Sequence, residues 1–405
     1  MLHRKAVVLS LIVVAALALS GCGEPPPPER VTVAFTGTEG IRALFENTVQ
    51  LALDEYHERG IGVPVEIVWM GQGTEEDPYG LIDVEIERAA VQRAVDDPDV
   101  VAIIGGTTSS MVQVGIPISN EGGVAYLSGG AYWAGLTQPG YGPGEPGIYY
   151  PTGVRNFFRM CARDDTTTRA MAAFLVEQLG AESVYIANHA TQIAARSFAG
   201  QFELAAMDAD MEVIALEELD PTVQDEVEAL AARIVDAQPD VLYVSGVGID
   251  SLVYAVRALD PGLAIVGTEI TDIVLNEPPE GRTLADLEGI YYQDQYPHPS
   301  LLDTEEARAF IAAYEPRYGE LDSTWGGQFA NAHEATSVVL YAIERAEEPT
   351  REGVLRSLQN LGTYSGIYGD WTFTPYGDMT IGFSLIHQLQ GGEWHMVDFT
   401  TREQD

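Results

Sequence analysis

The sequence predicts an α/β fold made of two doubly wound lobes. From Val31 onward, short apolar segments of strand length alternate with amphipathic segments of helix length, a pattern typical of parallel sheets covered by helices. A loop rich in glycine and proline, residues 138–153, separates the first alternating series from a second one that begins near Asp165. The two series show no sequence repeat, so we expect them to share an architecture only.

The first series contains four predicted strands and three predicted helices. The strands are expected at 31–35, 64–70, 100–104 and 125–128, and the helices at 42–59, 81–96 and 109–121. In the second series, strands between helices are expected at 183–188, 212–216, 241–245 and 264–267. Three further helices and three further strands are expected at 305–318, 329–346, 350–361, 371–373, 381–390 and 394–399.

The clearest helix signal follows the turn at Asp220-Pro221-Thr222. Its apolar residues recur at i, i+3, i+4, i+7 and i+8, which places them on one face of a helix. These residues are Val227, Leu230, Ala231, Ile234 and Val235. We expect this face to pack against a sheet.

The N-terminus has the order of a bacterial export signal. Arg4 and Lys5 precede an apolar run at 6–19, which is shorter than the about 20 residues of a membrane-spanning helix. Leu19-Ser20-Gly21-Cys22 follows and resembles the lipobox of bacterial lipoproteins. The resemblance implies removal of residues 1–21 and attachment of acyl chains to Cys22. The alternative is an ordinary signal peptide that ends near a cysteine.

Residues 22–29 would then form the lipidated end and a tether. Four consecutive prolines, 25–28, favour an extended spacer that holds the folded part away from a membrane. The expected location is the extracytoplasmic face of the cell membrane, with the lipid as the only membrane anchor. Only Cys161 remains as a thiol in the mature chain, so no disulfide is expected.

The chain is strongly acidic, with 61 acidic and 21 basic residues and a net charge of −40. This charge excludes nucleic acid as a partner, because binding to phosphates requires a basic surface. The carboxylates suit a surface that stays hydrated at high ionic strength, where salt screens their repulsion. A compositional bias of the lineage toward acidic residues and arginine is the alternative, since Lys5 is the only lysine.

The sequence contains none of the catalytic or metal motifs that we tested. No serine has glycines two residues before and after it, and His333-Glu334 lacks the second histidine of a zinc-protease helix. His189 and His333 are isolated, and the histidines show no metal-type spacing. We therefore expect no cofactor, no metal and no enzymatic activity, and predict a binding protein.

Two segments of the first series resemble the leucine/isoleucine/valine-binding proteins, which are type 1 periplasmic binding proteins. They are IIGGTTSS at 103–110 and LSGGAY at 127–132, with Ala131 placed 22 residues after Ser109 as in that family. The resemblance covers nearly all of the mature chain and continues through 149–153, 158–159 and 164–165. It implies two lobes joined by a three-crossing hinge, with lobe 1 at 30–164 plus 296–367 and lobe 2 at 165–295 plus 368–405.

The resemblance also implies that the first lobe holds the carboxylate of a zwitterionic ligand. Ser109 matches the family serine, and Ser110, Gly130, Ala131 and Tyr132 complete the implied site. Independently, a helix that starts near Ser110 has free N–H groups and a positive dipole end at the edge where ligands of α/β sheets bind. The alternative role of Ser109 is a plain helix cap.

For the ammonium group the resemblance implies Glu269, Asp164 and the carbonyl of Gly130 as acceptors. Ile193 and Val247 stand where the family has aromatic residues against the ligand side chain. Two further departures are Tyr132 in place of a threonine and Thr108 in place of a cysteine that some relatives bridge. Trp133 and Trp325 could fill the space left by the smaller residues. The ligand is therefore predicted to be amino-acid-like, without a preference for leucine.

The expected function is solute capture for an ABC importer with an inner-membrane permease as partner. A ligand sensor of the same fold is the first alternative, and permease genes beside this one would exclude it. An exported enzyme is the second alternative, which turnover of a bound compound would support.

Overall fold

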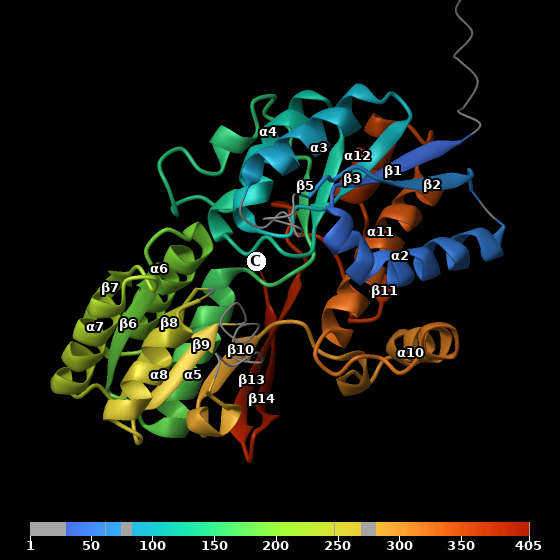
Figure 1. Ribbon diagram of the computed structural model, residues 1–405. Coiled ribbons are helices and arrows are strands. Elements are labelled where there is room, and N and C mark those ends of the chain that lie inside the picture. The colour runs from blue at the N-terminus through green and yellow to red at the C-terminus, as the bar shows by residue number, and fades with distance from the viewer. Residues whose placement is uncertain (1–29, 61, 74–82, 247, 269–280, 405) are drawn as a thin grey trace, which may run out of the picture.

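A five-stranded parallel sheet forms the centre of lobe 1 in the described part of the chain (Figure 1). The computed structural model describes residues 30–60, 62–73, 83–246, 248–268 and 281–404. The strand order is β2-β1-β3-β4-β5, with bounds Val65–Trp69, Val31–Phe35, Val100–Ile104, Ala125–Ser128 and Phe157–Arg159. This order reverses direction at β1 and β3, as in a doubly wound sheet.

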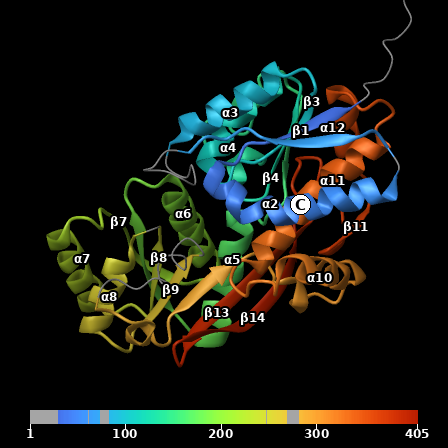
Figure 2. The ribbon, with the colours of Figure 1, turned by 45° about the vertical axis from the view of Figure 1, so that its right-hand side comes forward.

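Helices cover both faces of this sheet. Helices α3 and α4, at Val84–Asp96 and Ser109–Glu121, pack on one face through side chains such as Val91 and Val112. The other face is covered by α2, α10, α11 and α12, at Glu39–Arg59, Glu305–Tyr318, Gly326–Arg345 and Arg351–Gln359. Elements from both ends of the chain therefore build lobe 1, as Figure 2 shows for α2 and α11.

Lobe 2 contains a seven-stranded mixed sheet among the described residues. Strands β6 to β10 run parallel, and β13 and β14 add an antiparallel hairpin at one edge. The strands β7, β6, β8, β9, β10, β13 and β14 span Glu212–Leu219, Ser183–His189, Val241–Ser245, Ala264–Thr268, Tyr291–Asp294, Ile381–Gln390 and Glu393–Glu403. On one face lie α5 and α6, and on the other α7 and α8, at Asp164–Leu179, Ile193–Asp208, Gln224–Ala237 and Asp250–Leu259.

The remaining elements are short. They are the β11–β12 ribbon, Tyr364–Gly366 with Gly369–Trp371, and the 3-10 helices η1 to η4 at Ala134–Leu136, Gly147–Tyr149, Leu284–Leu287 and Pro299–Leu301. In the described ranges, no helix combines the length and apolar character needed to cross a bilayer.

The predicted α/β fold with two doubly wound lobes is confirmed. The predicted bounds of α4, α10, β4, β8 and β13 agree with the structure, and on α7 Val227, Leu230, Ala231 and Ile234 are buried while Val235 is partly buried. The helix expected at 42–59 begins earlier, at Glu39, because the Thr38 side chain accepts a hydrogen bond from the Ile41 N–H and so caps it. The strand expected at 371–373 is displaced, since β12 ends at Trp371 in a ribbon with β11.

The described chain passes three times between the two sheets. The first crossing, 160–163, joins β5 to α5; the second, 295–298, joins β10 to η4; the third, 372–380, joins β12 to β13. The lobe boundaries that the sequence predicted stay a prediction. Cys22 and the export signal lie outside the described residues.

Candidate functional site

The carboxyl ends of β3 and β4 meet at the edge of the lobe 1 sheet that faces lobe 2. The chain turns there through Gly106, whose φ of 65° favours glycine, and enters α4 at Ser109. The cap of α4 is Thr108, whose side chain accepts a hydrogen bond from the Met111 N–H at 3.4 Å. The alternative that Ser109 is the helix cap is therefore wrong.

Ser109 connects α4 to a segment that we name the 129–138 loop, which follows β4. The Ser109 side chain is buried, and its Oγ accepts a hydrogen bond from the Trp133 N–H at 3.0 Å. A serine hydroxyl can accept and donate at once, so the proton of Ser109 stays available for a further acceptor. Ser110, one residue further along α4, is partly exposed.

The close approach of this loop to Thr107, between β3 and α4, requires glycine at position 130. A Cβ on Gly130 would lie 2.5 Å from the Thr107 carbonyl oxygen, closer than atoms can approach. The Gly130 N–H donates to the Ser128 Oγ at 3.2 Å. Next to it, Ala131 is fully buried.

A second contact of the 129–138 loop reaches lobe 2. The Tyr132 ring lies 5.6 Å from the ring of Phe198 on α6, centroid to centroid. Its hydroxyl is 2.8 Å from the Tyr296 hydroxyl, which itself donates to the Gly129 carbonyl at 2.6 Å. The two lobes therefore touch across the predicted ligand residues.

Asp164 is the first residue of α5 and is fully buried at the same contact. Its Oδ1 accepts from the Ala134 N–H at 3.0 Å, and its Oδ2 accepts from the Ser197 hydroxyl. Burial raises the pKa of the Asp164 carboxyl group to about 7. Since protein groups engage both oxygens, its role as an acceptor for a ligand ammonium stays a prediction.

The other predicted site residues are less closely connected. Ile193 begins α6 and is 46% exposed. Val247 and Glu269 lie outside the described residues. The Trp133 indole N–H donates to both carboxylate oxygens of Glu145, at 3.0 and 3.1 Å. These two bonds fix the orientation of the Trp133 ring.

Polar atoms also end two strands at the facing edge of lobe 2. Asn188 and Ser245 are register partners on β6 and β8, and neither is exposed. Among the described residues, the Asn188 Oδ1 and the Ser245 Oγ have no hydrogen-bond partner. Such atoms are costly to bury unpaired, so this edge favours additional polar contacts.

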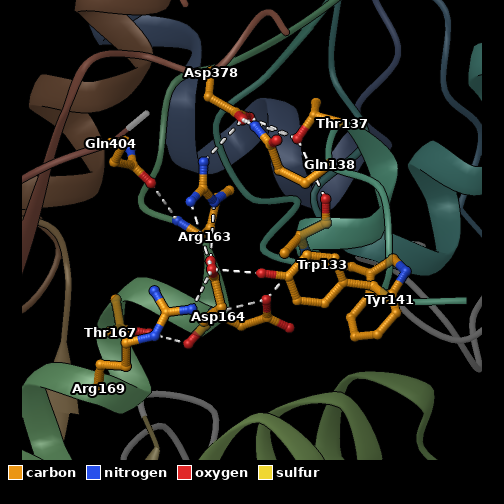
Figure 3. A network of polar contacts seen from close by, with 12 residues as sticks. Trp133, Thr137, Gln138, Tyr141, Arg163, Asp164, Thr167, Arg169, Asp378 and Gln404 are labelled. Carbon is orange, nitrogen blue, oxygen red and sulfur yellow. Dashed lines mark hydrogen bonds and ion pairs between the residues drawn. The ribbon is translucent and has the colours of Figure 1, made fainter. Parts of the chain in front are cut away.

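A buried ionic network lies behind the 129–138 loop. The Asp378 carboxylate accepts from the Arg159 Nε at 2.9 Å and from the Thr137 hydroxyl at 2.9 Å, and it lies 3.4 Å from Arg163. Figure 3 shows Asp378 facing Thr137, Gln138 and Arg163. Arg163 also forms a 2.9 Å ion pair with Asp165. Each charge is thus paired, which a buried charge requires.

The sequence matches a known protein family. A family model described as periplasmic binding protein matches residues 35–392. The chain belongs to the periplasmic binding protein family. No curated protein sequence matches it significantly.

Solved structures of periplasmic binding proteins share its fold at low identity. The leucine-binding protein LivK of Thermotoga maritima superposes with a TM-score of 0.71 at 21% identity, over 92% of this chain and 98% of that one. LivJ of Streptococcus pneumoniae with isoleucine gives 0.70 at 18%, over 93% and 99%. A solute-binding protein of Rhodopseudomonas palustris with p-hydroxybenzoic acid gives 0.68 at 17%, over 93% and 98%.

Sequence reasoning did not identify several residues that bond to the 129–138 loop of this periplasmic binding protein. Arg159 stands inside a Phe-Phe-Arg-Met segment, and an arginine inside an apolar run is a signal that it is buried and paired. Tyr296 and Asp378 carry no such signal. Tyr296 follows a short strand and Asp378 follows a turn, and each bonds to a residue more than 100 positions away in the sequence. Within the described ranges, no His, Cys, Asp and Glu group could hold a metal ion.

Proposed function

We propose that this protein is the lipid-anchored, extracytoplasmic solute-binding protein of an ABC importer, and that it captures an amino-acid-like zwitterion between its lobes. The observation that carries the proposal is Ser109, buried at the first turn of α4, with its oxygen held by the Trp133 N–H and its proton free to donate. Isoleucine and p-hydroxybenzoic acid, bound in two of the similar structures, share a carboxyl group. A carboxylate suits the N-terminus of a helix.

The charge of the chain favours a zwitterion over a simple anion. A net charge of −40 repels an anionic solute, whereas an ammonium group offsets that repulsion. Asp164, Glu269 and the Gly130 carbonyl are the proposed acceptors for this group. The partner would be an inner-membrane permease, and turnover of the bound solute would contradict the proposal.

Replacing Ser109 by alanine is expected to weaken solute binding about tenfold to a hundredfold, because one hydrogen bond to a charged group is lost. Mass spectrometry of molecules released from native protein identifies the solute, and calorimetry measures its affinity for both forms. The matched control is Ser323→Ala, since Ser323 is exposed and lies outside α4 and the 129–138 loop. Equal affinity of Ser109→Ala and wild type would contradict the proposed site.

Replacing Cys22 by serine is expected to move the protein from the membrane fraction to the soluble fraction, because serine offers no thiol for the lipid. The native host is fractionated, and the N-terminal mass of wild-type protein is measured. Cys161→Ser is the matched control, since that thiol is buried within the fold. Unacylated Cys22 in wild-type protein would rule out the anchor.

A further inference from the structure

Polar side chains from the second and third crossings, and one from the residue that directly follows the first crossing, bond to the 129–138 loop. Directly after the first crossing, at the start of α5, Asp164 accepts from the Ala134 N–H. In the second, the Tyr296 hydroxyl donates to the Gly129 carbonyl at 2.6 Å. In the third, Asp378 accepts from the Thr137 hydroxyl and from the Gln138 side chain, the latter at 2.8 Å (Figure 3).

Arg159 joins the third crossing to the middle of the loop. Its guanidinium is fully buried and donates from Nε to Asp378 at 2.9 Å. The other nitrogens donate to the Ala131 carbonyl at 2.9 Å and to the Trp133 carbonyl at 3.0 Å. Because the guanidinium is a rigid planar fork, Asp378 and these two carbonyls hold one geometry together.

Backbone hydrogen bonds also join the third crossing to β5 and the start of α5 to the 129–138 loop. The Arg159 N–H donates to the Gly377 carbonyl at 2.8 Å, and the Met379 N–H donates to the Arg159 carbonyl at 3.0 Å. The Asp164 N–H donates to the Tyr132 carbonyl at 3.0 Å. The hinge and the loop that carries the predicted ligand residues therefore form one connected hydrogen-bonded unit.

We propose that Tyr296, Arg159 and Asp378 are positioning residues that couple the hinge to the 129–138 loop, so that the solute-binding form of the loop and the closed form of the hinge exist together. The coupling serves solute binding only if the proposed solute site is correct. The hydrogen bonds that produce the coupling are present in the structure independently of that site. Buried polar groups cannot lose their partners cheaply, so a rotation of the crossings moves the loop with them. In general, packed interfaces switch between discrete arrangements and do not deform continuously.

The test compares amide hydrogen exchange in the full lipidated chain, without added solute, for wild type, Tyr296→Phe and Tyr376→Phe. Tyr296→Phe removes the hydroxyl that bonds to the Gly129 carbonyl and to Tyr132 but keeps the ring, so exchange is expected to become about tenfold faster. The faster exchange should reach the amides of Asp164, which follows the first crossing, and of Met379 in the third crossing. Tyr376→Phe is the control, since this exposed tyrosine lies in the third crossing.

The outcomes separate coupling from a local structural role. Faster exchange in all three crossings and in the 129–138 loop supports the proposal. Tyr132→Phe, which removes the contact between the two hydroxyls but keeps the bond from Tyr296 to the Gly129 carbonyl, should give a smaller change in the same peptides. Faster exchange confined to the peptides around Gly129 and Tyr296, or no change, overturns it. Because no solute is added, failure of the Ser109 test leaves this result unaffected.

Discussion

Replacing Asp378 by alanine is expected to lower the free energy of unfolding by about 3–5 kcal/mol. The carboxylate is fully buried and lies within ion-pair distance of both Arg159 and Arg163, at 2.9 and 3.4 Å. Its removal leaves the fully buried guanidinium of Arg159 without a counter-charge. It also leaves the Thr137 hydroxyl without its acceptor on this side chain.

Urea denaturation measures this loss, with Glu393→Ala as the matched control. Glu393 is an exposed acid at the start of β14, so its removal should change stability by less than about 0.5 kcal/mol. The loss of stability for Asp378→Asn should lie between those for Asp378→Ala and Glu393→Ala. The amide oxygen still accepts one hydrogen bond, but the NH₂ group faces a guanidinium. A loss below about 1 kcal/mol for Asp378→Ala would show that the network contributes little to folding.

The fold was predictable where local pattern decides structure. The alternation around β3, α4 and β4 gives both the elements and their bounds. Strands β5 and β10 were missed because three or four residues are too few for a periodic signal. The hairpin of β13 and β14 was predicted as two strands, but its place beside β10 depends on pairing across about 90 residues, which no local pattern reveals.

The candidate site was predictable to a similar extent. Ser109 follows from the start of a helix after a strand, whereas the family resemblance implied Gly130, Ala131 and Tyr132 of the 129–138 loop. The structure connects Ser109 to this loop directly through the Trp133 N–H. The supporting residues Arg159, Tyr296 and Asp378 could not be found in this way. Their roles arise from three crossings that meet in space only when both lobes are assembled.

Replacing Glu87 by glutamine is expected to stabilise the protein at pH 8 and to leave it nearly unchanged at pH 4. Glu87 lies on α3, fully enclosed, and its Oε1 accepts from the Thr36 hydroxyl at 2.6 Å and from the Tyr126 hydroxyl. Burial raises the pKa of Glu87 from 4.5 to about 7, and the two hydrogen bonds oppose this rise. Glutamine keeps an oxygen for both donors and carries no charge.

The direction of this pH dependence follows from the raised pKa of the Glu87 carboxyl group in the folded protein. Below about pH 4.5 the carboxyl group is protonated in both the folded and the unfolded chain, and its contribution to stability is fully present. As the pH rises from about 4.5 to about 7, the unfolded chain ionises while the native site resists ionisation, so stability is lost over this range; above about pH 7 both states are ionised and no more is lost. A rise from 4.5 to about 7 corresponds to at most about 3 kcal/mol. Asp164 and Asp294, whose pKa values burial raises to about 7 and about 6, act in the same direction.

Urea denaturation of wild type and Glu87→Gln at pH 4, 5, 6, 7 and 8 isolates the contribution of this one group, because Asp164 and Asp294 remain in both proteins. The difference in the free energy of unfolding should be near zero at pH 4, grow in favour of the variant between about pH 4.5 and 7, and level off by pH 8. Glu85→Gln is the control on the same helix, since Glu85 is exposed and pairs with Arg88 at the surface. Parallel stability curves for wild type and Glu87→Gln would mean that Glu87 ionises in the folded protein as readily as in the unfolded chain, and that the Thr36 and Tyr126 hydroxyls fully offset its burial.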